Sequence, residues 1–201
     1  MNQWEIKGHV LEYIDESHRY LVDGVCVPSV TQIMKSRFKK KYADIDTTIL
    51  ARAASSGTAV HEAIEIYCKE GIDLGLKEVK NFQFLQKHYN FEVLDNEVPI
   101  ILFKDDIPIA AGRLDLVLKL DGKVGGGDIK RTSSLDKEYL AYQLNLYRIG
   151  YYQCYGIKWE FLKGLHLKDD IRRFVDIPIN EEMAWGLVDL YLENKEFENN
   201  D

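Results

Sequence analysis

The sequence predicts an α/β fold in which a mixed central β-sheet is flanked by helices. Residues 112–130 carry strand patterns around a tight turn, and residues 47–70 and 136–155 carry helical patterns long enough to cover a sheet. Strand and helix patterns alternate within a chain of 201 residues, of which 46% are hydrophobic. We therefore expect one globular domain.

Composition excludes several classes of protein. Cys26, Cys68 and Cys154 are single and widely spaced, which argues against a disulfide framework, a zinc site or an iron–sulfur cluster. No apolar run reaches the length of a membrane span and no signal region is evident, so we expect a soluble, cytoplasmic protein without a membrane partner. The net charge of −7 opposes DNA binding over the whole surface. Contact with nucleic acid would have to be local or carried by a metal.

The central hairpin is the most informative stretch. Leucine occupies every second position from 114 to 120, the pattern of a strand with one buried face, and Asp121-Gly122 favours a two-residue turn. Counting back from that turn places Asp115 opposite Asp128 on the face away from the leucines, with Cβ atoms about 5 Å apart. Lys130 returns to that face two residues later.

Two opposed carboxylates repel each other and destabilise a sheet unless a cation lies between them. Hard divalent cations such as Mg²⁺ take oxygen ligands of this kind. Asp115 and Asp128 are therefore candidate metal ligands. The alternative is that both are solvated residues on an exposed face, neutralised by Lys130, and the hairpin alone does not separate the two interpretations.

The N-terminal part is expected to hold short strands at 10–14, 19–22 and 25–27, followed by a helix capped by Ser29 and Gln32. A basic patch interleaved with Phe38 and Tyr42 comes next. It predicts a phosphate-binding surface with aromatic stacking platforms, and a solvated basic helix end is the alternative. The basic residues of this patch are Lys35, Arg37, Lys39, Lys40 and Lys41.

The helix predicted at 47–70 carries Gly57 and His61 one turn apart. A glycine there would let another backbone approach close to the imidazole. A lone histidine is more often a core residue, but beside a carboxylate pair His61 becomes a candidate third ligand. Glu97, in a predicted strand, could be a further ligand or water-positioning acid, with a surface glutamate as the alternative.

The remaining patterns complete the predicted fold. Gln143 interrupts the apolar stripe of the helix at 136–155, one turn before Tyr147, and a buried amide needs hydrogen-bond partners. The other expected elements are strands at 91–93, 97–103, 107–111, 159–166 and 171–177, a helix at 77–90, and a closing helix that begins at Asn180.

Four motifs in order resemble the PD-(D/E)xK nucleases, most closely their RecB-like and phage exonuclease branch. The stretch from His18 to Thr31 is also similar to small phage members, so the resemblance covers about residues 18 to 150. Leu114 stands where the family name has proline, and glycines fill 125–127 where bulky apolar residues are usual; a bulge there would shift the hairpin register by one residue. The motifs are Gly57-x-x-x-His61, Gly112-Arg-Leu-Asp115, Asp128-Ile-Lys130 and Gln143-x-x-x-Tyr147.

The resemblance implies a restriction-endonuclease-like core and a metal-dependent DNA nuclease, an exonuclease of phage-type recombination, replication or repair. Asp115, Asp128, His61 and the Ile129 carbonyl would hold one or two Mg²⁺ or Mn²⁺ ions. Lys130 would orient or activate the attacking water. Gln143 and Tyr147 would support the site from their helix. Substrate binding is assigned to basic residues, namely Lys35, Arg37, Lys39, Lys40, Lys41, Arg52 and Arg131.

The resemblance further implies a single nuclease domain over 1–201, with a hairpin and basic helix appended at 1–45, a catalytic core at 46–180 and a C-terminal helix and tail at 181–201. The expected partner is DNA with an end, double- or single-stranded. A recombination or single-strand-binding partner and a homo-oligomer stay open.

Two alternatives to a nuclease remain at this point. The first is a nuclease-like DNA-binding module that no longer cuts, although such a copy has no physical reason to retain opposed acids. The second is a structural or partner-binding protein whose acidic residues lie on the surface and have no functional role, and this alternative predicts no Mg²⁺ binding. The sequence also leaves open exonuclease against endonuclease, strand polarity, and DNA against RNA.

Overall fold

The computed structural model describes residues 2–38 and 47–198, with side chains over 2–38 and 55–195. It confirms the α/β class, with a four-stranded sheet of order β1-β2-β3-β4 and a five-stranded sheet of order β5-β6-β7-β8-β9. The elements are β1 (Asn2–Ile6), β2 (His9–Ile14), β3 (Arg19–Val22), β4 (Val25–Val27), α1 (Val30–Phe38), α2 (Thr47–Glu70), α3 (Lys77–Tyr89), β5 (Glu92–Lys104), β6 (Ile107–Leu120), β7 (Lys123–Lys130), α4 (Lys137–Tyr155), β8 (Phe161–Lys168), β9 (Ile171–Ile177) and α5 (Glu181–Glu198).

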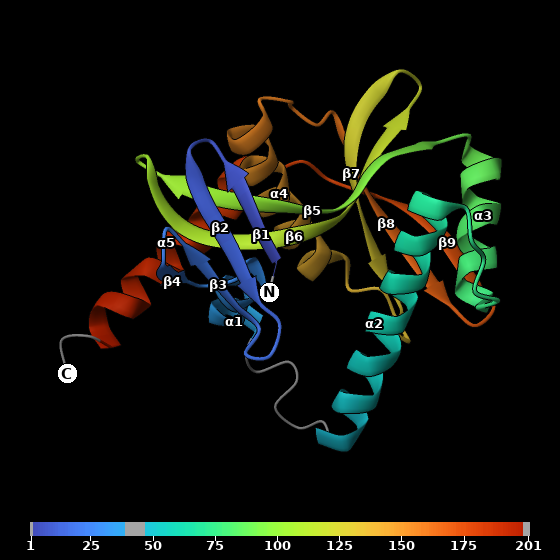
Figure 1. Cartoon of the computed structure of the whole chain (residues 1–201), viewed down its shortest axis with the longest axis horizontal. Coiled ribbons are helices and arrows are strands. Elements are labelled where there is room, and N and C mark those ends of the chain that lie inside the picture. Colours follow the sequence, from blue (N-terminus) through green and yellow to red (C-terminus); the bar gives the residue numbers. More distant parts are fainter. Residues whose placement is uncertain (1, 39–46, 199–201) are drawn as a thin grey trace.

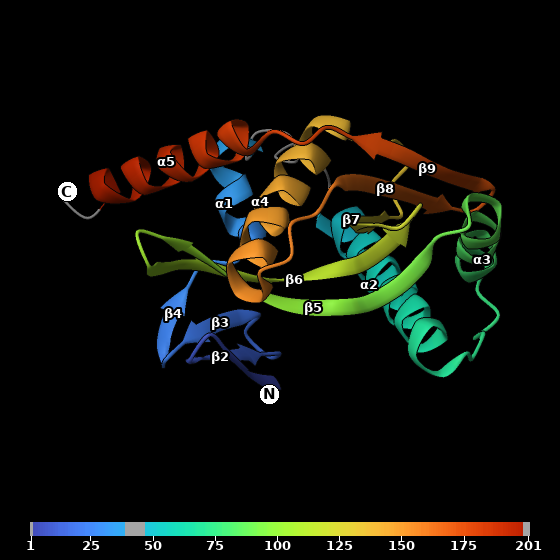
Figure 2. The ribbon, with the colours of Figure 1, turned by 90° about the horizontal axis from the view of Figure 1, so that it is seen from above.

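The five-stranded sheet is mixed, as predicted: β7 and β8 are parallel, and its other neighbouring strands are antiparallel. Helices α1, α4 and α5 pack on one face (Figures 1 and 2). Helices α2 and α3 cover part of the other face, over β6 to β9. No helix among the described residues combines the length and apolarity that a membrane span requires.

The four-stranded sheet covers the rest of that second face. It packs through its apolar side on Ile101 and Phe103 of β5 and Ala111 of β6. Figure 2 shows β2, β3 and β4 on the side of β5 and β6 away from α1, α4 and α5. Three of its strands follow the predicted ranges closely, whereas β1 was not predicted. This face of the five-stranded sheet is therefore covered in part by a second sheet and in part by helices.

The predicted register of the central hairpin is confirmed as far as Leu116 and Gly127, where the ladder ends, but the predicted pairing of Asp115 with Asp128 is wrong. Leu120 pairs with Lys123, Leu118 with Gly125, and Leu116 with Gly127. The turn residues Asp121 and Gly122 have φ of 51° and 79°, the left-handed conformation that such a turn needs.

The glycine run at 125–127 forms no bulge, because the register passes through it unshifted. A Cβ on Gly125 would lie 2.5 Å from Phe161, and one on Gly126 would overlap the ring of Trp159. These glycines are therefore required by the close approach of two aromatic side chains.

The expectation of one leucine face on β6 is wrong. Leu114 packs with α1 and α4, whereas Leu116 and Leu118 pack with α2 and α3. Both faces of this strand are covered, so apolar residues do not mark one of them. The change of face falls at Asp115, where β6 parts from β7.

The ends of the helices follow the predicted capping signals. The Ser29 amide donates to Gln32 Oε1 at 2.7 Å, and the Gln32 amide donates to Ser29 Oγ at 3.1 Å, which is the expected capping box. Helix α2 ends at Glu70, and the following Gly71 has a φ of 72°, the left-handed conformation typical of a helix C-terminus. Asp136 caps α4, which is buried from Leu140 to Tyr151 between the sheet and its neighbouring helices.

Candidate metal centre

Asp115 lies where β6 and β7 separate. The pairing of these strands ends at Leu116 and Gly127, and Asp115 is the next residue of β6. Its Oδ2 accepts a hydrogen bond of 2.7 Å from the backbone amide of Ile129. The carboxylate thus replaces the next hydrogen bond of the ladder, and its position is fixed from the neighbouring strand.

His61 reaches this carboxylate from α2. Its Nε2 lies 3.0 Å from the Ile129 carbonyl, and its Nδ1 lies 3.6 Å from Asp115 Oδ1 and 3.9 Å from Glu97 Oε1. A carbonyl oxygen only accepts, so Nε2 carries the proton of this hydrogen bond. The lone pair of Nδ1 in a neutral imidazole would then face two carboxylates. A proton or a cation between them would remove that repulsion.

Glu97 completes the group from β5. The ligand atoms of His61, Glu97 and Asp115 all lie within 4.8 Å of one another. Glu97 is not a surface residue, since its side chain is 16% exposed and pairs with Arg113 at 3.1 Å. Its φ is 50°, a left-handed conformation that is costly for a residue with a side chain and is enriched at functional sites.

The cluster concentrates negative charge away from water. Burial, aided by the charge of Asp115, raises the pKa of Glu97 to about 7. Burial acts to lower the pKa of His61, but the carboxylates of Asp115 and Asp128 outweigh it and the pKa is raised. Both shifts mean that the folded protein favours the protonated forms of Glu97 and His61. The negative charge that stabilises these protons would also stabilise a bound cation.

Asp128 does not join that group but forms a buried pair beside it. Its Oδ2 lies 2.5 Å from Lys130 Nζ, and the side chains are 2% and 22% exposed. Its Oδ1 has no hydrogen-bond partner among the described residues. Burial raises the pKa of Asp128 to about 6. Burial acts to lower the pKa of Lys130, but the charge of the neighbouring Asp128 outweighs burial and the pKa of Lys130 is raised. The interpretation of Asp128 as a solvated surface acid is therefore wrong.

Tyr147 and Gln143 lie beneath the site on α4, and both are buried. The Gln143 side chain bonds Tyr147, while Gln143 Oε1 has no hydrogen-bond partner among the described residues. A Cβ on Gly112 would lie 2.9 Å from the Tyr147 ring. The glycine of the Gly112-Arg-Leu-Asp115 motif therefore makes room for the tyrosine of the last motif.

No described atom lies within 4 Å of a Cβ built on Gly57, so the expected close backbone approach at that glycine is wrong. Phe38 is not a stacking platform either, since it is buried and packs edge-on against Tyr139 and Tyr142. The apolar face of α1 is used for the core, and its last residue belongs to that face.

Three of the basic residues assigned to the substrate have described side chains, and none of the three belongs to the cluster of His61, Glu97 and Asp115. Arg131 is paired with Glu78 at 2.7 Å and Arg37 with Glu138 at 2.9 Å, and Lys35 is exposed on α1. The remaining positions lie outside the residues whose side chains are described: Lys39, Lys40, Lys41, Tyr42 and Arg52.

A cavity of about 360 Å³ opens over the cluster. The four-stranded sheet contributes Tyr13, His18 and Tyr20 to the lining, and the sequence analysis did not predict these residues at the site. The signal that could have indicated them was the resemblance of the stretch from His18 to Thr31 to small phage nucleases. The lining residues are Tyr13, His18, Tyr20, Ser29, Thr31, Thr58, His61, Glu97, Gly112, Arg113, Asp115 and Tyr147.

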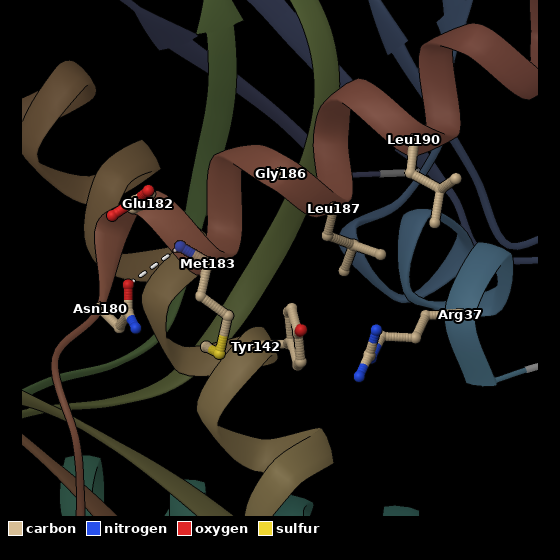
Figure 3. A pocket seen from close by; sticks show the side chains of 8 residues that line it. All are labelled: Arg37, Tyr142, Asn180, Glu182, Met183, Gly186, Leu187 and Leu190. Atoms are coloured by element: carbon tan, nitrogen blue, oxygen red, sulfur yellow. Dashed lines mark hydrogen bonds between the residues drawn. The ribbon is translucent and has the colours of Figure 1, made fainter.

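A second cavity, of about 440 Å³, lies between α1, α4 and α5. Figure 3 shows Arg37, Tyr142, Met183 and Leu187 around it, with the Asn180 side chain accepting from the Met183 amide. Glu182 is the sole carboxylate among the described residues that line this second cavity. Those residues therefore do not offer the paired acids that a divalent cation would need.

No family model matches the chain, and no curated protein matches it significantly. A solved structure described as the crystal structure of SSO0001 is similar to it, with 17% identity, a TM-score of 0.48, and coverage of 83% of this chain and 75% of that one. At this TM-score the likeness carries no conclusion about function.

Proposed function

We propose that this protein is a metal-dependent DNA nuclease. The observation that carries the proposal is the convergence of His61, Glu97 and Asp115 in a cavity beside the buried Asp128–Lys130 pair. Two carboxylates and one imidazole nitrogen fit Mg²⁺ or Mn²⁺, one or two ions per site. When bound, the ion would offset phosphate charge and lower the pKa of a water.

The protein itself contributes positioning and preorganised charge. The Ile129 carbonyl directs Nδ1 of His61 toward the two acids, and the Ile129 amide holds Asp115. Asp128 keeps the Lys130 ammonium charged at the edge of the cluster. A fixed positive charge at that point stabilises the negative charge that develops on a phosphodiester during hydrolysis.

The resemblance to RecB-like and phage exonucleases supports DNA as the substrate and an exonuclease that serves recombination, replication or repair in the cytoplasm of a bacterial or phage-infected cell. The overall charge of −7 agrees with binding that depends on a local site and a cation rather than on a basic surface.

The test is incubation of linear and circular DNA with the protein in Mg²⁺, Mn²⁺ or EDTA. We expect loss of linear DNA with either metal, sparing of covalently closed circles, and no reaction in EDTA. Asp115→Asn should be inactive, whereas Asp121→Asn, which changes an exposed acid of the hairpin turn, should match the parent. Binding of DNA without cleavage under every condition would favour the non-cleaving module instead.

A further inference from the structure

The four-stranded sheet contributes an aromatic wall to the cavity. Tyr13 and Tyr20 stand on neighbouring strands β2 and β3 and are paired across them. Their rings lie 4.8 Å apart at 38°. The Tyr13 hydroxyl bonds His18 Nδ1 at 2.8 Å, and His18 is exposed in the turn between the strands.

Arg113 joins this wall to the acids. Its Nε lies 3.1 Å from Glu97 Oε2, and its guanidinium carbon lies 5.3 Å from the centre of the Tyr13 ring. Among the described residues that line the cavity it is the one arginine or lysine, and its side chain is 33% exposed. Guanidinium groups bind phosphate through paired N–H donors and also stack on aromatic rings and bases.

We propose that Tyr13, His18 and Arg113 form a subsite for one unpaired nucleotide next to the bond that is cut, so that the substrate enters as a single strand or a frayed end. The aromatic side chains would stack on the base, and Arg113 would bind a neighbouring phosphate. This inference rests on the proposed function and adds the form of its substrate.

The reason for an unpaired nucleotide is physical. Aromatic side chains bind bases through exposed π-faces, and inside a duplex those faces are covered by stacking. The cavity is also lined by β2 and β3, through Tyr13 and Tyr20, and by α2, through His61. An extended single strand can pass between such walls.

Packing explains Tyr20, and Tyr13 in part, but not His18. Tyr20 is 8% exposed and belongs to the core of the four-stranded sheet. Tyr13 packs against that core but is only partly buried, and His18 is exposed; both line the cavity. A purely structural role predicts that replacing these two changes stability without changing nucleic-acid binding.

The experiment measures, by fluorescence anisotropy in Ca²⁺, the binding of two labelled probes: a twelve-nucleotide oligothymidylate and a blunt hairpin duplex. A gel confirms that the oligonucleotides stay intact. The parent should bind the single strand more tightly. Tyr13→Leu should weaken that binding by about 5-fold to about 100-fold, the usual effect of one lost base–aromatic contact. Tyr13→Phe keeps the ring and should stay within about twofold of the parent.

Tyr152→Leu is the matched control, because Tyr152 is 53% exposed on α4 and does not line the cavity. Should Tyr13→Leu fail to fold, His18→Asn serves in its place, since asparagine accepts the φ of 50° at that position. It should also weaken single-strand binding, by at least about 3-fold.

The subsite is overturned if the parent prefers the duplex or binds neither probe, or if Tyr13→Leu and His18→Asn both bind the single strand like the parent. Cleavage in Mg²⁺ with unchanged binding by these variants would remove the subsite and leave the nuclease. Single-strand binding that depends on Tyr13, without cleavage in any metal, would remove the nuclease and leave the subsite.

Discussion

The backbone amide of Ile129 donates to Asp115 Oδ2 at 2.7 Å, just beyond the last pair of the β6–β7 ladder. The same residue accepts from His61 Nε2 through its carbonyl at 3.0 Å. One peptide segment of β7 thus orients two candidate ligands that come from different elements. The resemblance assigned the Ile129 carbonyl to the metal, and its contact with His61 gives it an orienting role.

This relationship separates two variants of Asp115. Asp115→Asn keeps an oxygen for the Ile129 amide and removes the charge that repels Glu97 and Asp128. In EDTA its melting temperature should equal or exceed that of the parent, and its rise on adding Mg²⁺ should vanish, because ligand stabilisation depends on affinity. Asp115→Ala leaves the amide unpaired and should lose about 1 to 3 kcal/mol. A normal Mg²⁺ response in Asp115→Asn would remove this carboxylate from the metal site.

Lys130 should be required for the rate of cleavage. It should also stabilise the folded protein, because it pairs with the buried carboxylate of Asp128. Lys130→Met leaves a buried carboxylate unpaired, which typically costs about 3 to 5 kcal/mol, and removes charge worth about two to three orders of magnitude in rate. Adding Asp128→Asn should restore much of the stability without restoring cleavage. Lys119→Met, at a site where the side chain is 43% exposed, is the control. Near-normal turnover of Lys130→Met would exclude Lys130 from the mechanism.

The stability of the metal-free protein should fall as pH rises from about 4 to above 7. Burial raises the pKa of Asp128 from 3.8 to about 6 and that of Glu97 from 4.5 to about 7, and the pKa of His61 is raised above 6.5. The folded state then binds more protons than the unfolded state across this range, so the free energy of unfolding decreases with pH. Urea unfolding in EDTA at stepped pH measures this trend.

Mg²⁺ should flatten that profile above about pH 7, where the acids are ionised and a cation can replace the protons. The matched variant is Glu97→Gln, which removes one of the titrating groups and should reduce the slope between about pH 5 and 7. Stability that rises over this range in EDTA would show that the acids are not held close together in solution.

The glycine run gives a prediction about packing alone. Gly126→Ala places a methyl group into the ring of Trp159, whose relative exposure is 0%. Overpacking of this kind typically costs about 1 to 3 kcal/mol, or more where the backbone must shift. Gly186→Ala is the control, because no described atom lies within 4 Å of a Cβ built at this position in α5, and alanine should add about 0.5 to 1 kcal/mol there. Equal unfolding midpoints for the two variants would contradict the packing at Trp159.

Turns and helix ends could be predicted from the sequence because they depend on residues that are close together in the chain. The turn at Asp121-Gly122 sets the hairpin register, and Ser29 and Gln32 set the start of α1. The sheet to which a strand belongs depends instead on contacts between distant segments. No pattern in residues 2–27 shows that their sheet packs against Ala111 and walls the cavity.

Glu97 shows why the ligand set was incomplete. Lys104 pairs with Ile107 at the turn, and an unshifted register would bring Asn96 opposite Asp115. An irregularity between Leu102 and Phe103 moves the register by one residue, which brings Glu97 to that level instead. Bulges of this kind leave little trace in a sequence pattern. The sequence predicted Asp128 in the cluster, and the structure has Glu97 there instead. Asp128 is displaced because β6 and β7 separate beyond Leu116 and Gly127, and counting residues back from the turn assumes that the two strands stay paired.

The central claim is that His61, Glu97 and Asp115 bind a divalent cation, and calorimetric titration of Mn²⁺ into metal-free protein near pH 8 tests it most directly. The parent should bind one or two ions per chain with release of protons, and Glu97→Gln and Asp115→Asn should each weaken or abolish one binding event. Glu92→Gln, at an acid whose side chain is 67% exposed on the same strand as Glu97, should titrate like the parent. No saturable binding by the parent, or unchanged binding by both cluster variants, would contradict the account.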